Sequence, residues 1–464
     1  MPPFGCSTND SRTKSAFAFW QAGVDAVRGE VAICRSVELE ADCLRLGELR
    51  IPRRSFDRIL VVGGGKATAA MTAGLISRLG QRVPLRGWIN VPEGTAEGLS
   101  ASDLHVCQAR PAGVNEPTAL AVQGTQAILD AVASASKRDL CLVLLSGGGS
   151  ALLVAPAVGI SLADKLAVTR HLSASGAAIT ELNTVRKHLS RVKGDRLRRT
   201  CRASRLVTLV LSDVLGDPLD MIASGPTTPD TTTAADALAV LRQYDPERSL
   251  PPAIYRCLDR ALQHSVGAAT ASETVVIANN AVAVNAAADR AENFGFQVES
   301  EAGTTPEGSA ESVGQRLAQR AVELLRQDRG GGGNTYCFVS GGEPVVRLAP
   351  AEVRGKGGRN QQLVLAAMIE LARHPAFRAE DRSRLVLLSG GTDGEDGPTD
   401  SAGAVLNAAV WQACEQQGLV PLDYLRRNDA YRFFAKTGGL LLTGPTGTNV
   451  CDLRVLTVSP AHRT

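Results

Sequence analysis

Several glycine-rich segments of this chain carry residues that could bind an anion such as phosphate. In the first, GGGKAT, Lys66 follows an apolar run from Arg58 to Val62 and precedes an Ala-rich stretch. This pattern predicts a buried strand, a glycine turn and a helix, in which the N–H groups from Gly64 to Ala67 and the positive end of the helix dipole could bind an anion. Lys66 would add a full positive charge there. The segment is not a Walker A motif, because Leu60 and Ala67 stand where that motif needs Gly and Ser or Thr.

The same pattern recurs after the apolar run from Leu140 to Leu145, where SGGGSALL predicts another glycine turn that enters a helix. A serine hydrolase would need the G-x-S-x-G pattern, which is absent, so hydrolase chemistry is not expected. The candidates for phosphate or substrate binding in the two turns are Gly64, Gly65, Ser146, Gly147, Gly148, Gly149 and Ser150.

A third apolar run, Arg205 to Leu211, is followed by the acidic segment SDVLGDPLD. Its carboxylates at Asp213, Asp217 and Asp220 would cluster at the end of a strand. Asp213 could instead cap the next turn, as Ser-Asp pairs commonly do. Three strands with ligand-type loops at one end predict a doubly wound α/β domain.

Four carboxylates crowd one loop in the C-terminal half of the chain, namely Asp393, Glu395, Asp396 and Asp400. They follow the apolar run from Leu385 to Leu388, which predicts a strand buried on both faces of a parallel sheet. Open α/β sheets place ligands at the carboxyl ends of their strands, and a cation or a metal-bound phosphate would relieve the repulsion in this loop. A solvated acidic turn explains the loop equally well when it is taken alone.

Arg359 and Asn360 stand at the predicted start of a long helix, Gln361 to Arg373, directly after GKGG. The planar guanidinium could match phosphate oxygens with its fork of donors. Arg359 could also pair with a carboxylate of the loop from 393 to 400. The remaining candidates for nucleotide or metal binding are Glu343, Asp393, Asp396 and Asn449, each of which could instead belong to an ordinary turn.

The predicted elements divide the chain into two α/β domains, residues 1–265 and 266–464. The segment from Glu273 to Ala278 is expected to begin the second domain with a strand. A helix from Ser15 to Arg35 is expected to pack against the first domain. The segment from Glu181 to Arg199 predicts one basic amphipathic helix, whose charges are expected on a solvated face.

Composition narrows the class of protein. The chain has 464 residues, 44% hydrophobic and 21% charged, as expected for a globular protein of two or three domains. A net charge of +3 and 4% aromatic residues argue against a dedicated nucleic-acid binder. No apolar run reaches the about 18 residues that a transmembrane helix needs. The ten cysteines form no CxxC pair and the six histidines no HxxxH pair, so buried thiols in a reducing cytosol are expected rather than a zinc site.

Eight colinear motifs resemble the glycerate 2-kinase family, in the class II type with a C-terminal MOFRL domain. In chain order they are GGGKAT, LLSGGGSAL, KHLSRVKGDRL, LSDVLGDPLDMIASGPTTPD, SGGEP, GKGGRNQQLVLA, SGGTDGEDGPTDSAGAV and TGPTGTNVCDLRV. One segment departs from the family, because Ala109 to Pro117 reads ARPAGVNEP where many members have a His-Pro-x-Pro-Asp-like sequence. The resemblance implies an N-terminal Rossmann-like doubly wound domain, a C-terminal α/β MOFRL domain and a site in the cleft between them.

The resemblance also implies an activity, the transfer of the γ-phosphoryl group of ATP to the 2-hydroxyl of D-glycerate with the help of Mg²⁺. Such a transfer depends on charge neutralisation and on an oriented hydroxyl. Lys66 and Arg359 match the catalytic Lys and Arg of the family and could clamp the transferring group. Asp213 matches its catalytic Asp and would be either the base or a magnesium ligand, with Asp393 as the other candidate ligand.

Two competing functions stay open at the level of the sequence. An NAD(P)-dependent hydroxypyruvate reductase would share the substrate chemistry, but no GxGxxG with an acidic residue about twenty positions on is present. A non-catalytic sugar-phosphate sensor could use the same turns without Asp213. We expect a cytoplasmic monomer or homodimer that binds a small-molecule substrate and neither nucleic acid nor a membrane.

Overall fold

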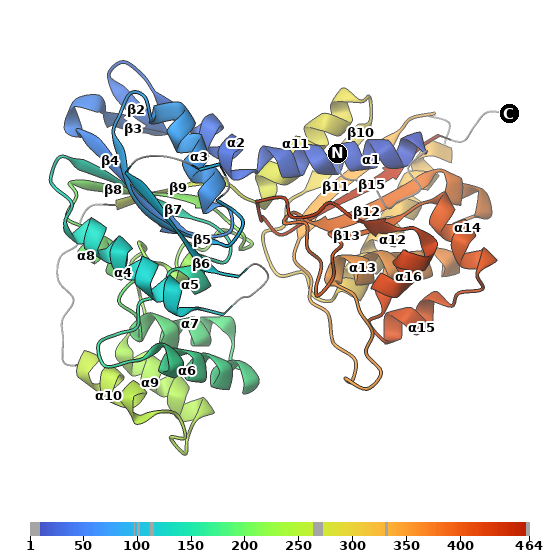
Figure 1. Cartoon of the computed structure of the whole chain (residues 1–464). Helices are drawn as coiled ribbons and strands as arrows, with labels where there is room; N and C mark the ends of the chain where they lie inside the picture. Colours follow the sequence, from blue (N-terminus) through green and yellow to red (C-terminus); the bar gives the residue numbers. More distant parts are fainter. Residues whose placement is uncertain are drawn as a thin grey trace. The chain divides into compact units, whose positions relative to one another are not determined.

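The computed structural model describes residues 10–96, 98–99, 103–111, 116–262, 272–329 and 333–460. The chain forms two compact units, and each is described by itself (Figure 1). The Rossmann-like unit is Gly29–Ile277, and the C-terminal unit consists of the described residues of Met1–Arg28 and Ala278–Thr464. The boundaries expected from the sequence, 1–265 and 266–464, therefore differ from the observed ones at both ends of the Rossmann-like unit.

Six strands form the sheet of the Rossmann-like unit, and they are β4 (Arg58–Gly64), β5 (Leu85–Pro92), β6 (Leu104–Arg110), β7 (Asp139–Leu145), β8 (Arg205–Leu211) and β9 (Ser272–Ala278). Their order is β6-β5-β4-β7-β8-β9, and the pairs from β6 to β8 are parallel. The chain order reverses between β4 and β7, as in a doubly wound sheet, so the Rossmann-like prediction is confirmed. Because β9 pairs at the edge of this sheet, the segment expected to begin the second domain completes the first.

The first candidate residues lie where the strand order of this sheet reverses, between β4 and β7. In doubly wound sheets, ligands bind outside the carboxyl ends of the strands at the point where the strand order reverses. The turn that holds Lys66 follows β4 and enters α3 (Thr68–Leu79), and the SGGGS loop follows β7 and enters the short α5 (Gly149–Leu152). Asp213 follows β8, the neighbour of β7.

The remaining helices of this unit include a separate cluster around its own hydrophobic core (Figure 1). The cluster contains α6 (Leu162–Ala174), α7 (Ile179–His188), α9 (Ala234–Tyr244) and α10 (Pro252–Ala261). Elsewhere lie α2 (Gly29–Ser36), α4 (Ala119–Ala133), α8 (Arg196–Thr200) and an antiparallel meander of β1 (Val37–Leu39), β2 (Cys43–Leu46) and β3 (Leu49–Pro52). Residues 112–115 of the segment that departs from the family lie outside the described residues.

The single basic helix expected from Glu181 to Arg199 is wrong in two respects. The segment forms α7 and α8, separated by a turn in which Gly194 and Asp195 adopt φ angles of +57° and +69°. A left-handed backbone cannot continue a helix, which explains the break. Lys187 and Lys193, expected on a solvated face, are only 3% and 1% exposed.

Six strands also form the sheet of the C-terminal unit, and they are β10 (Gln297–Glu301), β11 (Tyr336–Gly342), β12 (Leu385–Gly391), β13 (Gly403–Leu406), β14 (Leu440–Leu441) and β15 (Asp452–Val458). Their order is β10-β11-β15-β12-β13-β14. Only β10 and β11 pair in parallel, and the other neighbours are antiparallel. The unit is completed by α1 (Ser11–Ala26), α11 (Asn280–Asn293), α12 (Ala310–Gln327), α13 (Arg359–Arg373), α14 (Ala408–Gln416), α15 (Pro421–Arg426) and α16 (Ala430–Thr437).

The prediction that β12 belongs to a parallel sheet is wrong, because β12 pairs antiparallel with both β15 and β13. Its apolar run has another cause. Leu385 and Leu387 belong to a core shared with α12 and α13, whereas Val386 and Leu388 belong to a core shared with α1 and α11. Both faces of the sheet are covered, and this burial requires a continuous apolar strand whatever its direction.

The helix expected from Ser15 to Arg35 forms two helices, α1 and α2. The second, α2, packs in the first domain, as expected, whereas α1 packs in the C-terminal unit. Phe19 and Trp20 are fully buried in the core shared with α11, β12 and β15. The Trp20 indole N–H donates to Gly390 O at 3.4 Å. A side chain at Gly23 would begin 2.5 Å from Leu453, so the glycine permits the close approach of α1 to β15.

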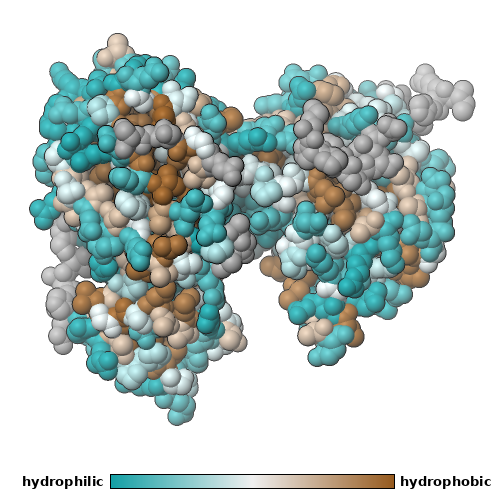
Figure 2. All heavy atoms as spheres, in the orientation of Figure 1, coloured by the Kyte–Doolittle hydropathy of each residue, from teal (hydrophilic) through white to brown (hydrophobic). Residues whose placement is uncertain are grey.

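Hydrophilic residues predominate on the face drawn in Figure 2, and hydrophobic ones form scattered patches over both units. None of the helices within the described ranges combines the length and the apolar character that a bilayer span requires.

Candidate active site

The turn after β4 is bonded to the loop after β7 through its backbone. Lys66 N donates to Gly147 O at 2.8 Å, Ala67 N donates to Ser146 Oγ at 3.0 Å, and Gly65 N donates to Asn90 O at 3.3 Å. The expectation that the N–H groups of this turn are available to an anion is therefore wrong for residues 65 to 67. The capacity of the turn to bind an anion rests on the Lys66 side chain, which is partly exposed.

Glycine is required where these two loops meet. A Cβ atom at Gly65 would lie 2.1 Å from Ser146 Oγ, closer than any contact between unbonded atoms. Gly148 has a φ angle of +76°, which favours glycine, and its Cβ position lies 3.0 Å from Arg110 Nη2 and 3.6 Å from Lys66 Cγ. The structure thus brings Gly64, Gly65 and Lys66 together with the SGGGS loop, as the sequence predicts.

The residues of the SGGGS loop divide into two groups by their contacts. Ser146, only 1% exposed, and Gly147 accept hydrogen bonds from the Lys66 turn. Gly149 N donates to Ser146 O at 3.1 Å and closes the loop, while Ser150 Oγ lies 2.9 Å from Ser224 Oγ. The loop therefore supports the Lys66 turn on one side and, through Ser150, contacts the turn that begins at Ser224 on the other.

Asp213 lies two residues beyond β8, at the same edge of the sheet as the Lys66 turn and the SGGGS loop. Its side chain is partly exposed. The turn that follows contains a hydrogen bond from Val214 N to Ser212 Oγ, 3.4 Å long. Ser212 thus contributes to this turn, and the position of Asp213 at the strand end suits either predicted role.

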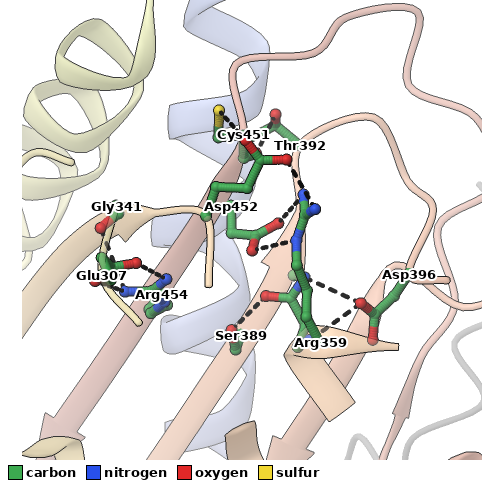
Figure 3. Close-up of polar contacts among 12 residues, drawn as sticks. Glu307, Gly341, Arg359, Ser389, Thr392, Asp396, Cys451, Asp452 and Arg454 are labelled. Atoms are coloured by element: carbon green, nitrogen blue, oxygen red, sulfur yellow. Dashed lines mark hydrogen bonds and ion pairs between the residues drawn. The ribbon is translucent and has the colours of Figure 1, made fainter. Parts of the chain in front are cut away.

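In the C-terminal unit, α13 begins at Arg359, two residues before the predicted start at Gln361, and Arg359 is held by two carboxylates (Figure 3). Its Nε and Nη2 donate to the two carboxylate oxygens of Asp452 at 2.8 and 3.0 Å, and Nη1 donates to Glu343 at 2.8 Å. Burial is the largest single effect and lowers the pKa of Arg359, but the charge and hydrogen bonds of Asp452, together with the charges of Glu343 and Asp396, outweigh burial and raise the pKa. The pairing with the loop from 393 to 400, left open by the sequence, does not occur directly.

Asp452 is the main residue of this site that sequence reasoning missed. It is fully buried at the start of β15, next to β11 and β12 in the sheet. Its fork-to-fork pairing with Arg359 fixes the plane of the guanidinium and uses two of its five N–H donors. The only signal in the sequence is the Asp itself, in TNVCDLRV, and a separation of 93 residues from Arg359 hides the contact.

Asp396 is directed into the start of α13 and not toward solvent (Figure 3). Its carboxylate accepts hydrogen bonds from Asn360 N at 3.0 Å, Gln361 N at 2.9 Å and the Asn360 side chain at 3.3 Å. Asn360 in turn accepts a hydrogen bond from Ser389 Oγ at 2.6 Å. Asp396 and Asn360 therefore orient the first turn of α13, on which Arg359 stands.

Burial raises the pKa of Asp396 to about 7, although the hydrogen bonds that its carboxylate accepts from Asn360 and Gln361 act to lower the pKa. An unfolded Asp has a pKa near 3.9, so the native chain binds the extra proton between about pH 4 and 7. Stability should fall as the pH rises through this interval and level off above it. We expect Asp396→Asn to remove this dependence of the free energy of unfolding on pH. A pKa shift of this size changes that free energy by at most about 4 kcal/mol.

The test uses urea unfolding between pH 5 and 8 in a Trp88→Phe background, because the other tryptophans, Trp20 and Trp411, report on the C-terminal unit. Asp400→Asn is the matched control from the same loop. A hydrogen bond from the Tyr431 hydroxyl lowers the pKa of Asp400, so this carboxylate is ionised in both states across the whole range. The same pH profile in wild type and Asp396→Asn would contradict the assignment.

The acidic loop does not gather its carboxylates around one point. Asp393 Oδ1 accepts a hydrogen bond from Glu395 N, Asp396 caps α13, and Asp400 accepts from Tyr431. Within the described ranges, the only three candidate ligands close enough to share a metal are Glu40, Asp42 and Cys43. Three of the four carboxylates thus have local partners, which fits the ordinary acidic turn that the sequence left open as the alternative.

The last two candidates have local partners. Glu343 contacts Arg359, as described above, and keeps a side chain that is 42% exposed. Asn449 Oδ1 accepts a hydrogen bond from Cys451 N at 3.1 Å, in a turn where Cys451 has a φ angle of +69°. The turn-closing explanation of Asn449 thus matches its geometry.

Comparison with known proteins finds a matching family model for each of the two units. The model of a domain of unknown function, DUF4147, matches residues 15–259, and the MOFRL family model matches residues 336–452. D-glycerate 2-kinase of Thermotoga maritima is 38% identical and is aligned over 87% of this chain and 91% of its own. A relative from Agrobacterium vitis, provisionally named a hydroxypyruvate reductase, is 36% identical over 88% of this chain and 89% of its own.

A crystal structure of glycerate kinase from Thermotoga maritima is similar over nearly the whole length of both proteins. The TM-score is 0.81 with 34% sequence identity, and the match covers 97% of this chain and 99% of that one. Family models, relatives and fold agree with the motifs found in the sequence. The chain belongs to the glycerate 2-kinase family that combines a DUF4147 domain with a MOFRL domain.

Proposed function

We propose that this protein is an ATP-dependent glycerate 2-kinase, which transfers the γ-phosphoryl group to the 2-hydroxyl of D-glycerate and releases 2-phosphoglycerate and ADP. The observation that carries the proposal is the group of three loops at one edge of the Rossmann-like sheet, with Lys66 and Asp213 at the ends of β4 and β8. Membership of the glycerate 2-kinase family supports it. Phosphoryl transfer needs these two groups, a cation for the phosphoryl oxygens and a carboxylate near the hydroxyl.

Lys66 neutralises charge on the transferring phosphoryl group in this proposal. Its turn is fixed to the SGGGS loop by the hydrogen bonds of Lys66 N and Ala67 N, so the ammonium is carried on a rigid support. A group held in place before the reaction stabilises the transition state without a cost of reorganisation. Arg359 contributes a second cation to the same reaction, and Asp452 and Glu343 leave it two N–H donors for a ligand.

Asp213 either accepts the proton of the 2-hydroxyl or binds the metal of the nucleotide. Magnesium in kinases is commonly bound by one or two protein carboxylates together with the phosphates of the substrate, so a single partly exposed Asp fits this need. When bound, Mg²⁺ would neutralise charge on the phosphate oxygens. Asp393 is the weaker candidate for the metal ligand, because its carboxylate already accepts a hydrogen bond from Glu395 N.

The proposal includes a cytoplasmic location, where the reducing environment would keep the nine cysteines of the described chain as thiols. The name of the Agrobacterium vitis relative favours a second candidate, an NAD(P)-dependent hydroxypyruvate reductase. The turn after β4 argues against it, because the GxGxxG pattern is absent there.

The test is an assay of the purified chain with D-glycerate, ATP and Mg²⁺, in which ADP is measured and the product is identified by ³¹P NMR. We expect ADP release that requires D-glycerate, a 2-phosphoglycerate product and loss of activity when EDTA removes the metal. A parallel assay contains hydroxypyruvate and NADH or NADPH. Oxidation of the reduced nucleotide without any ADP release would replace the kinase by the reductase.

A further inference from the structure

A small cavity of the Rossmann-like unit is lined by four cations, and only one of them, Arg170, is paired with an acid. Its volume is about 140 Å³, and Lys165, Arg186, Lys193 and Ser150 are among the residues that line it. Lys165 is 6% exposed and Lys193 only 1%. In the described part of the chain, no carboxylate lies within the 4.0 Å of an ion pair from any of the other three cations. Glu116, which also lines the cavity, pairs with Arg170.

The two lysines bind backbone carbonyl groups with only part of their donors. Lys193 Nζ donates to Ser150 O at 2.9 Å and Ala223 O at 3.3 Å, and Lys165 Nζ donates to Leu189 O at 2.9 Å and Arg186 O at 3.3 Å. An ammonium has three N–H donors, so one remains on each lysine. Arg186 donates to Asn183 Oδ1 at 3.4 Å and has four further N–H groups.

Three neighbouring cations without an acid are costly for a folded protein, because neither water nor a counter-charge compensates them fully. Burial, followed by the charges of Arg186 and Arg196, lowers the pKa of Lys165 to about 7. Burial also lowers the pKa of Lys193, helped by Arg186 and Lys165. An anion in the cavity would remove this penalty, whereas a purely structural role would be served as well by neutral side chains.

The cavity adjoins the loop that supports Lys66. Gly147 of this loop accepts the Lys66 N–H group, and Ser150, three residues on, lines the cavity. On the other side, Ser150 Oγ contacts Ser224, and Ala223 and Ser224 have φ angles of +50° and +63°. Two successive non-glycine residues in the left-handed region are strained, and such strain is concentrated at functional sites.

We propose that this cavity binds the carboxylate group of the phosphoryl acceptor and thereby selects short hydroxy acids over neutral polyols. The inference rests on the proposed function and adds a subsite to it. The cavity volume suits a small group such as a carboxylate, because a water molecule takes roughly 30 Å³ and pockets for drug-sized ligands begin at roughly 300 Å³. The acceptor would place its carboxylate among Lys165, Arg186 and Lys193, and its 2-hydroxyl would face the Lys66 turn.

Arg186→Met is the most informative variant, because Arg186 makes the fewest structural hydrogen bonds of the three cations. We expect kcat/KM for D-glycerate to fall about 10- to 100-fold, the effect of one lost hydrogen bond to a charged group. The KM for ATP should stay the same, as should kcat/KM for glycerol, which lacks the carboxylate. Arg186→Lys keeps the charge and should recover part of the loss. Arg242→Met, an exposed arginine of α9, is the control.

Equal losses with glycerol and D-glycerate would mean a general distortion and would overturn the proposal, as would an unchanged kcat/KM for D-glycerate. Calorimetric titration of the full-length chain with D-glycerate separates this result from the kinase activity. A wild-type chain that binds D-glycerate but phosphorylates nothing would refute the function, while loss of that binding in Arg186→Met would still support the subsite. Tighter binding of inorganic phosphate than of D-glycerate, lost in the same variant, would assign the cavity to phosphate instead.

Discussion

Lys66→Met is expected to lower kcat for the phosphorylation of D-glycerate by about 10³-fold or more, the usual effect of removing a cation from the transition state of phosphoryl transfer. Methionine keeps the length and the apolar stem of the side chain but not the charge. The hydrogen bonds from Lys66 N to Gly147 O and from Ala67 N to Ser146 Oγ belong to the backbone, so the turn should keep its shape.

The measurement is kcat and KM for both substrates, with a thermal unfolding midpoint for each variant. Lys137→Met, an exposed lysine of the same unit, is the matched control and should behave as wild type. A KM for D-glycerate that rises while kcat stays constant would show that Lys66 binds the ground state only, and the role proposed for it would have to be abandoned.

Asp213→Asn should have the second large effect, a fall in kcat of about 10²- to 10⁴-fold if Asp213 is the general base. Asn has the same shape and cannot accept a proton. The alternative role has a different signature, because loss of a magnesium ligand raises the Mg²⁺ concentration needed for half-maximal rate. A titration of rate against Mg²⁺ at saturating ATP and D-glycerate therefore distinguishes the two roles.

Asp259→Asn, an exposed carboxylate of α10, serves as the control for a change of net charge. If Asp213→Asn left both kcat and the magnesium dependence at wild-type levels, Asp213 would have no part in the chemistry. The sensor hypothesis, which needs no residue at this position, would then gain support.

The Rossmann-like unit was largely predictable from the sequence. Apolar runs followed by glycine turns mark β4 and β7, and a third run with an acidic turn marks β8; all three lie side by side in the sheet. The sequence could not show which groups bind the backbone N–H groups of the Lys66 turn. Sequence gives no means of knowing that Ser146 Oγ accepts the Ala67 N–H group, because this depends on how two distant loops meet.

The C-terminal unit was harder to predict for a physical reason. Burial on both faces produces the same apolar pattern in β12 as a parallel sheet would, so strand direction was lost. The insertion of β15 between β11 and β12 brings Asp452 to Arg359, a contact that no local pattern indicates. Likewise, the segment from 181 to 199 has the composition of a solvated helix. Only the folded structure shows that its two lysines are buried and that one of them, Lys193, lines a cavity.

The assignment of α1 to the C-terminal unit has a consequence for the order of events during synthesis. All of Gly29–Ile277 leaves the ribosome before the strands on which Phe19 and Trp20 pack, at roughly 5 to 20 residues per second. The first helix must therefore wait with its aromatic side chains uncovered until more than half of the protein has been made. A fragment that begins at Ala278 would keep α11 but lack α1, so the apolar part of the sheet on which Phe19 and Trp20 pack would be exposed to solvent.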